Sequence, residues 1–174
     1  MDGFGIRIKM KTLDLEKYIQ NLSTDLYSFA FILIPDDLQA TQLMIDSVSA
    51  FMIQKKDLIE SLTKKGESHL LANTEDIKIQ LYKLMYEMSK KRYHQLRMSF
   101  KNVEDNSGFF ALEFDDKAVL FLQERTDFSM DIMEFILGKT KTEVLAHLYS
   151  ARIAMVSELT SAQTAFVQGP PGHN

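Results

Sequence analysis

The sequence contains no cysteine, so disulfide bonds and thiolate metal sites are excluded, and a reducing cytoplasmic setting is the default expectation. A long hydrophobic run is also missing. The longest, FAFILI at 29–34, is far below the roughly 18 residues of a membrane span, and Pro35 and two aspartates follow it. The first residues, MDGFGIRIKMK, have too short an apolar stretch for a secretory signal. We therefore expect a cytoplasmic protein that does not enter the membrane.

Excess positive charge is absent as well. Lysine and arginine number 20 against 24 acids, a net charge of −4, which argues against a chain coated in basic charge for nucleic-acid binding. No phosphate-binding loop, dinucleotide fingerprint or nucleophile elbow occurs. The four histidines, at 69, 94, 147 and 173, have neither a partner at metal-ligand spacing nor a nearby acid pair in the sequence. We therefore expect no enzymatic activity, no cofactor and no metal.

Apolar residues recur at steps of three and four through most of the chain, which is typical of amphipathic helices. Pro35 ends the first helix because it cannot donate to the preceding turn, and Asp36 and Asp37 suit the start of the next. A loop or broken turn is expected from Gly66. The expected helices cover 13–34, about 37–52, a short segment around 57–62, about 73–100, 115–125, 129–137 and about 141–159, and no strand is predicted.

The helical pattern stops between Lys101 and Leu112, where KNVEDNSG has the composition of a connector. The ending, QGPPGHN, has nothing to bury. We therefore predict an all-α protein with two small helical domains. They are residues 13–101 and 112–162, joined by a linker at 102–111, with a flexible N-terminus at 1–12 and a disordered tail at 163–174.

The last fifty residues carry the most specific pattern. Ser129 is a natural N-cap, Gly138 stands where a left-handed residue ends a helix, and Thr140 with Glu143 has capping-box spacing. Two helices joined by a short turn containing glycine form the helix-turn-helix signature, in which the second helix enters the major groove of DNA. An ordinary helical hairpin uses the same caps and remains open from the pattern alone.

The segment AVLFLQERTDFSMDIMEFILGKTKTEVLAHLYSAR, 118–152, resembles region 4 of the extracytoplasmic-function sigma factors of bacterial RNA polymerase. The matching features are an apolar helix, a turn with Phe128 and Ser129, a helix ending at Gly138, and a second helix ending in Ala151 and Arg152. LYSFAFILIPDDLQATQLMIDSVSAF, 26–51, resembles region 2 of the same family, and LYKLMYEMSKKRYHQLR, 81–97, stands where the family has its next helix. The chain is a divergent relative by this resemblance, in both the core-binding and the promoter-reading segments.

The resemblance implies a sigma region 2-like bundle followed by a region 4-like helix-turn-helix. Such a protein is a nonenzymatic transcription initiation factor that binds RNA polymerase core and promoter DNA. Polymerase core binding is implied for the second helix, at Gln42, Leu43, Ile45 and Asp46.

A cationic segment follows at 83–101, where six bases stand against one acid, a local charge of 6 − 1 = +5. Interleaved Tyr86, Tyr93 and Phe100 suit stacking on unpaired bases. A solvated helix face flanked by core aromatics is the equal alternative. The predicted DNA contacts of this region are Lys83, Lys90, Lys91, Arg92 and Arg97.

The expected recognition helix places Val144, Leu148, Ala151 and Met155 toward the core and leaves an outer face without the Arg, Lys, Asn or Gln that bidentate base reading requires. Residues 112–160 hold five bases against nine acids, 5 − 9 = −4. The alternative function is therefore a degenerate sigma-like protein that serves as a protein–protein interaction or regulatory module. Its partner would be an anti-sigma or other protein, or a second copy in a homodimer. The expected DNA-binding or partner surface is Lys139, Lys141, Leu145, Ala146, Tyr149 and Arg152.

Overall fold

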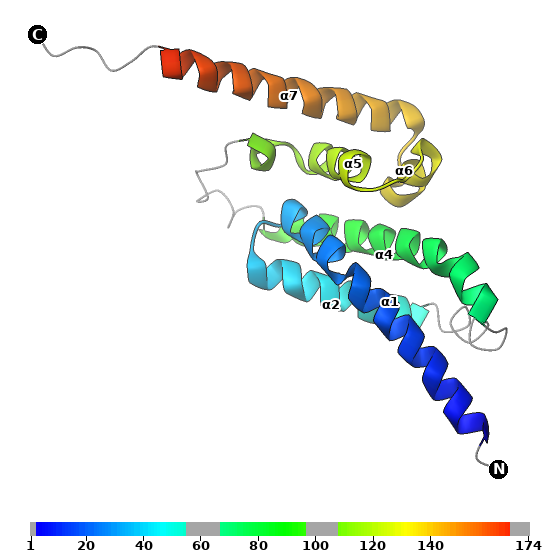
Figure 1. The fold of residues 1–174 in the computed structure, drawn as a ribbon. Coiled ribbons are helices and arrows are strands. Elements are labelled where there is room, and N and C mark those ends of the chain that lie inside the picture. The colour runs from blue at the N-terminus through cyan, green and yellow to red at the C-terminus, as the bar shows by residue number, and fades with distance from the viewer. Residues whose placement is uncertain (1–2, 55–66, 97–107, 168–174) are drawn as a thin grey trace, which may run out of the picture. The chain divides into compact units, whose positions relative to one another are not determined.

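The computed structural model describes residues 3–54, 67–96 and 108–167, and side chains at 15–54, 74–96 and 108–157 within them (Figure 1). Every element in these ranges is helical, and no strand occurs among them, so the all-α prediction is confirmed. The elements are α1 (Gly3–Leu33), α2 (Asp37–Gln54), α4 (Glu67–Leu96), the short 3-10 helix η2 (Gly108–Ala111), α5 (Phe114–Arg125), α6 (Met130–Leu137) and α7 (Lys141–Val167).

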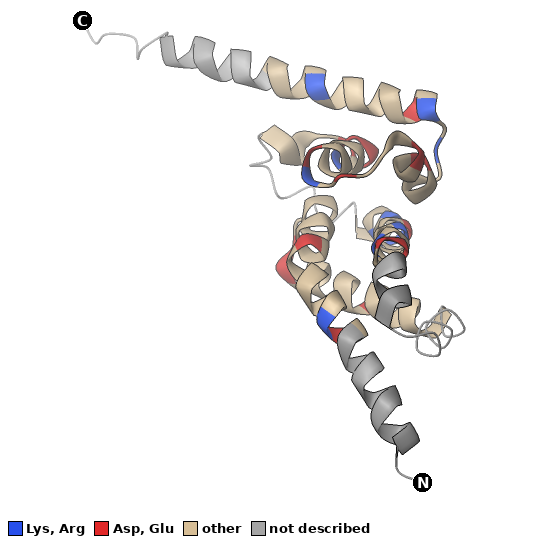
Figure 2. Cartoon of the chain, turned by 45° about the vertical axis from the view of Figure 1, so that its right-hand side comes forward, with Lys and Arg blue, Asp and Glu red and all other residues tan. Residues whose placement is uncertain are grey.

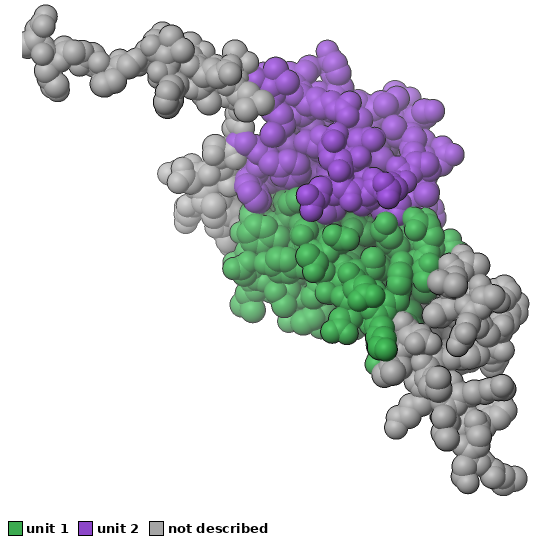
Figure 3. Space-filling view, in the orientation of Figure 1, with its two compact units in different colours: residues 1–95 green, residues 96–174 purple. Residues whose placement is uncertain are grey.

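The chain divides into two compact units, Met1–Gln95 and Leu96–Asn174, coloured separately in Figure 3. The first holds α1, α2 and α4, and the second holds η2, α5, α6 and α7. The linker predicted at 102–111 lies mostly outside the described residues, and its last four residues form η2.

Local signals around Pro35 set the turn between α1 and α2. The backbone N–H of Gln39 donates to the Asp36 carboxylate at 2.8 Å, so Asp36 caps α2 as predicted. Tyr27 Oη donates to Asp37 Oδ1 at 2.6 Å, which ties the end of α1 to the start of α2. The two helices pack against each other, and their contact faces supply much of the core of the first unit: Leu26, Phe29, Leu33, Ile34, Leu43 and Phe51.

Helix α4 completes the first unit by packing against both α1 and α2. The rings of Phe29 and Tyr82 lie 5.1 Å apart between centroids, and Tyr18 Oη donates to the Thr74 carbonyl at 2.8 Å. Arg92 reaches across to Asp46 of α2 at 2.8 Å. Aromatic packing therefore joins α4 to α1, and a charged contact joins it to α2.

Three helix boundaries differ from the sequence-based expectation. Helix α1 begins at Gly3 instead of residue 13, inside the segment predicted as flexible, and α7 continues to Val167, into the predicted tail. Helix α4 begins at Glu67, where a loop was expected, and the short helix expected at 57–62 lies outside the described residues. Extending a formed helix requires no new nucleation, so weakly amphipathic residues join the end of a stable neighbour.

In the second unit, the predicted caps are confirmed. Ser129 Oγ accepts from the backbone N–H of Ile132 at 3.4 Å, and Gly138 adopts the left-handed conformation at φ 60° and ψ 35° after α6. Glu143 accepts from the Thr140 N–H at 2.8 Å and the hydroxyl at 2.7 Å, and the Thr140 hydroxyl accepts from the Glu143 N–H at 3.4 Å. These local bonds fix the three-residue turn between α6 and α7.

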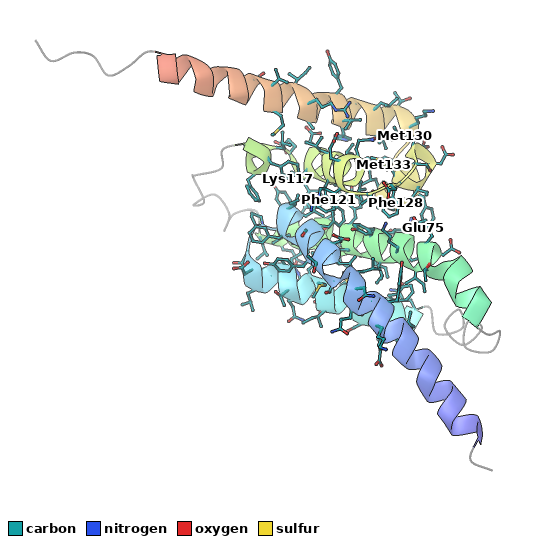
Figure 4. The ribbon with its side chains drawn as sticks, viewed as in Figure 1. Glu75, Lys117, Phe121, Phe128, Met130 and Met133 are labelled. Carbon is teal, nitrogen blue, oxygen red and sulfur yellow. The ribbon has the colours of Figure 1, made fainter. Side chains whose placement is uncertain are left out.

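Helix α5 packs against both α6 and α7 in the second unit, and Figure 4 shows the side chains on α5 and α6, Met133 among them. The buried residues contributed by the three helices include Val119, Leu122, Met133, Ile136, Val144, Leu148 and Ala151. Three of the four residues predicted to face the core from α7, Val144, Leu148 and Ala151, are buried, and the fourth, Met155, is half-buried. Among the helices that the structure describes, none combines the length and apolarity needed to cross a membrane.

Candidate protein-binding and nucleic-acid-binding surfaces

The outer face of α7 is an apolar stripe. Its large exposed side chains are Leu145, Tyr149, Ile153 and Val156, of which Tyr149 is the most open, at 70% exposure. Their spacing of three, four and eight residues keeps them on one side of the helix, away from Val144 and the rest of the buried stripe. Ala146 is also exposed. We call these five residues, Leu145, Ala146, Tyr149, Ile153 and Val156, the α7 outer face.

Most of the positive charge predicted for this surface is engaged within the unit. Lys139 Nζ lies 2.8 Å from Asp115 Oδ2, and both side chains are less than one-fifth exposed. Arg152 lies 3.2 Å from Glu124 in an exposed pair. Lys141 is exposed at the first residue of α7. Two of the three predicted cations therefore hold carboxylates of α5.

A polar cluster that the sequence did not predict joins α5 to α7. Asp116 is only 5% exposed, and its carboxylate lies 2.7 Å from His147 Nδ1 and accepts a hydrogen bond from Ser150 Oγ at 2.8 Å. His147 Nε2 lies 3.9 Å from Asp115. The acid pair near a histidine was missed because 31 residues separate Asp116 from His147. Only folding brings them together.

This cluster lacks the arrangement of a nucleophilic catalyst. Ser150 donates to Asp116 and not to His147, so the serine–histidine hydrogen bond of a nucleophile and its base is not formed. Among the residues that the structure describes, no group of three or more histidine or acidic side chains could hold a metal ion. The cluster positions α7 on α5, and Ser150 turns toward Asp116 instead of extending the outer face.

The cations of α4 do not share one face. Lys83 lies 3.9 Å from Glu87, and Lys90 sits 5.5 Å from the Tyr86 ring centroid, while Lys91 is exposed. Arg92 lies roughly on the opposite side of the helix from Lys90, because two residues correspond to about 200° of rotation. Arg97 lies outside the described residues. The described cations of this segment are therefore divided between a solvent side and a side that meets α2.

One of the three aromatic residues predicted to stack on unpaired bases is buried. Tyr86 is only 3% exposed and belongs to the core, where its hydroxyl accepts from Lys90 Nζ at 3.3 Å. Tyr93 is half-buried, and Phe100 lies outside the described residues. The alternative of a helix face flanked by core aromatics describes Tyr86 correctly.

Arg92, Asp46 and Gln42 form one network between α4 and α2. Arg92 donates to Asp46 Oδ2 at 2.8 Å and to the Gln39 carbonyl at 3.4 Å, and Gln42 Nε2 donates to Asp46 Oδ1 at 2.8 Å. These hydrogen bonds, from Arg92 first and Gln42 second, hold the pKa of the Asp46 carboxyl below its ordinary value because they stabilise its charged form. Arg92 is therefore occupied inside the first unit.

The predicted polymerase-binding residues of α2 lie on different sides of the helix. Leu43 is 0% exposed and belongs to the core, so it is not a surface contact. Ile45 is half exposed and borders an open groove of about 250 Å³ between α1 and α2. Ile19, Leu26, Met44, Ile45 and Val48 supply the apolar part of its lining. The groove was missed because it depends on how α1 packs against α2.

Comparison with known proteins gave no match. No protein-family model matches the chain, and no curated protein or solved structure does so either.

Proposed function

We propose that this chain is a nonenzymatic, sigma-like interaction protein. It binds RNA polymerase core through α2 of the first unit, and its helix-turn-helix presents the α7 outer face to a partner protein in place of a base-reading surface. The observation that carries the proposal is the exposed apolar stripe at Leu145, Tyr149 and Val156, next to an arginine that already holds a carboxylate.

Base reading requires side chains that donate two hydrogen bonds to one base edge. On this side of α7, Arg152 has that chemistry, and Glu124 already accepts from it at 3.2 Å. Lys139 is held more tightly, at 2.8 Å from Asp115 in a largely buried position. A DNA duplex would have to displace the largely buried Asp115 to use Lys139, and it would meet exposed apolar side chains beside Arg152. A protein partner would cover those side chains instead.

The groove between α1 and α2 supports the polymerase contact. Ile45 is half exposed, and Met44 and Val48 also line the groove, so a hydrophobic side chain from a partner helix can enter beside α2. Gln42 and Asp46 lie one turn apart on the adjacent side of the helix, where Gln42 Nε2 donates to Asp46 Oδ1 at 2.8 Å. An apolar pocket with a polar edge is the usual composition of a protein interface centre and its rim.

The test is binding of the full chain to purified RNA polymerase core enzyme, measured by biolayer interferometry. Ile45→Glu places a charge at the rim of the groove and is expected to weaken binding by about tenfold or more, the effect of removing a central interface residue. Asn21→Glu is the matched control, since it adds the same charge at an exposed position of α1 turned away from the groove. Equal affinities for all three proteins, or no binding by the unchanged chain, would reject the polymerase contact.

A second candidate is promoter binding by the first unit, which the exposed Lys91 and the neighbouring Lys90 of α4 favour. Lys90→Glu with Lys91→Glu would then abolish binding to a duplex with an unpaired promoter-like bubble, while Ile45→Glu would leave DNA binding unchanged. Fluorescence anisotropy with labelled DNA over a salt series separates the candidates. DNA binding that weakens steeply with salt and depends on both lysines would favour promoter recognition.

A further inference from the structure

The α7 outer face has the length and spacing of a surface that binds another helix. Leu145, Tyr149 and Val156 follow one another at steps of four and seven residues, and Ile153 lies beside them. The eleven residue steps from Leu145 to Val156 correspond to about 16 Å, or three helical turns, at 1.5 Å per residue. A partner helix presents its own apolar side chains at the same intervals, so the two stripes can interlock over their full length.

The charged residues that α7 itself places beside this stripe are basic. Between Lys141 and Ser157 the single acid is Glu143, which lies about 160° around the helix from Leu145 and is bound to Thr140 at 2.7–2.8 Å. Lys141 and Arg152 lie within about 40° of Leu145 around the helix axis. In Figure 2, the described part of α7 carries blue basic segments near its start and near its middle and a red acidic segment at its start.

Arg152 remains available to a partner despite its ion pair. Its side chain and that of Glu124 are both more than half exposed. An exposed pair of this kind contributes little to stability, so a partner carboxylate can replace Glu124 at small cost. The buried Lys139–Asp115 pair is different and stays within the unit.

A second copy of this chain fits the surface less well than an acidic helix. An antiparallel pair centred on the stripe places each Arg152 opposite Tyr149 of the other copy, where no carboxylate meets it. A parallel pair in register places the two Arg152 side chains opposite each other, and such like charges at an apolar interface are destabilising.

We infer that the occupant of the α7 outer face is an acidic amphipathic helix of a partner protein. This inference rests on the proposed role of α7 as a protein-binding surface. The partner's apolar side chains cover Leu145, Tyr149 and Val156, and its carboxylates pair with Lys141 and Arg152 at the rim. Rim pairs of this kind raise the association rate and select the partner's charge, while the apolar centre supplies most of the affinity.

The test uses the full chain and two synthetic peptides, each an amphipathic helix of about three heptads with leucine at the core positions. One peptide carries glutamate at its remaining charged positions and the other carries lysine. Fluorescence anisotropy at low salt is expected to give an affinity at least about tenfold higher for the acidic peptide, with the difference shrinking as salt rises.

Variants locate the binding site. Leu145→Glu is expected to abolish binding, and Arg152→Ala to reduce the preference for the acidic peptide. Ala154→Glu is the matched control, because Ala154 is exposed on the same helix about 180° from Leu145, and binding should be unchanged. Circular dichroism confirms that each variant keeps its helix content.

Three outcomes would overturn the inference. Equal affinity for both peptides would remove the charge preference, and binding unaffected by Leu145→Glu would place the site elsewhere. Self-association in sedimentation that Leu145→Glu abolishes would assign the surface to a second copy. The Ile45→Glu experiment with polymerase core reports on α2 alone, so failure of the peptide test leaves the polymerase contact standing, and the reverse also holds.

Discussion

Gly138 is the residue whose chemistry most directly sets the turn between α6 and α7. Its φ of 60° lies in the left-handed region, where a Cβ is disfavoured, and an added Cβ would have no heavy atom within 4 Å. The requirement for glycine is therefore a backbone requirement and not a packing one. A substitution at this position isolates the free energy of the turn from other effects.

We expect Gly138→Ala to destabilise the second unit by about 1 kcal/mol, the cost of placing an L side chain in this conformation. Gly138→Asn should cost less, because asparagine tolerates the left-handed region better. Urea unfolding followed by circular dichroism measures both changes. Equal stability of the alanine variant and the unchanged protein would show that the turn relaxes to another conformation.

Asp116 is the second residue with a predictable role. Its nearly buried carboxylate is hydrogen-bonded to both His147 and Ser150 of α7. Asp116→Ala removes the acceptor for two partly buried groups and is expected to cost about 1–3 kcal/mol. Asp127→Ala, at an exposed position of the same unit, should change stability by less than about 0.5 kcal/mol. Thermal unfolding of both variants tests the contrast, and equal losses would contradict it.

At the scale of elements, α2 and α4 are joined by the ion pair between Asp46 and Arg92, which stabilises the fold only while the Asp46 carboxyl is ionised. The pKa of Asp46 is lowered in the folded protein by hydrogen bonds from Arg92 and Gln42. A carboxyl with a lowered folded-state pKa stabilises the fold above its unfolded pKa, near 3.8, and this contribution is lost as pH falls through the folded pKa.

Asp46→Asn is therefore expected to destabilise the protein by about 0.5–1 kcal/mol at neutral pH, a size limited by solvent screening of this partly exposed pair. The difference from the unchanged protein should disappear in strong acid, where both are uncharged at this position. Urea unfolding at pH 7 and in strong acid measures it. A difference that stays constant with pH would mean that packing, and not charge, carries the effect.

At the scale of the whole molecule, charge sets the expected response to nucleic acid. The net charge is −4, and Arg92, Lys139 and Arg152 hold carboxylates within their own units. Few phosphates can then be neutralised, so little counterion release is available to drive binding. Among the described cations, Arg92 and Lys139 are already engaged within their own units.

We expect the full chain to bind a random-sequence duplex with a Kd no tighter than about 10⁻⁴ M at physiological salt, the weak end of nonspecific binding. Fluorescence anisotropy against salt concentration measures both the affinity and the slope. A slope corresponding to six or more released counterions, as for phosphate-binding proteins, would contradict this expectation.

Local chemistry allowed much of the second unit to be predicted. Ser129, Gly138, Thr140 and Glu143 act within three or four residues of themselves, so their hydrogen bonds and backbone angles follow from neighbours in the chain. The buried stripe of α7 follows from helical periodicity for the same reason. The outer ends of α1 and α7 were missed because a weak amphipathic pattern does not report how far a helix extends.

The sequence by itself determined that the chain is helical and where the turn between α6 and α7 lies. It also determined that the α7 outer face lacks base-reading side chains. Each of these features depends on residues within one or two helical turns of one another. Only the tertiary structure decided which cations are occupied. Arg92 contacts Asp46, which is 46 residues away in the sequence, and Asp116 contacts His147, which is 31 residues away. The groove beside Ile45 forms only because α1 packs against α2. Coulomb energies and burial depend on distance in space, which the order of residues does not fix.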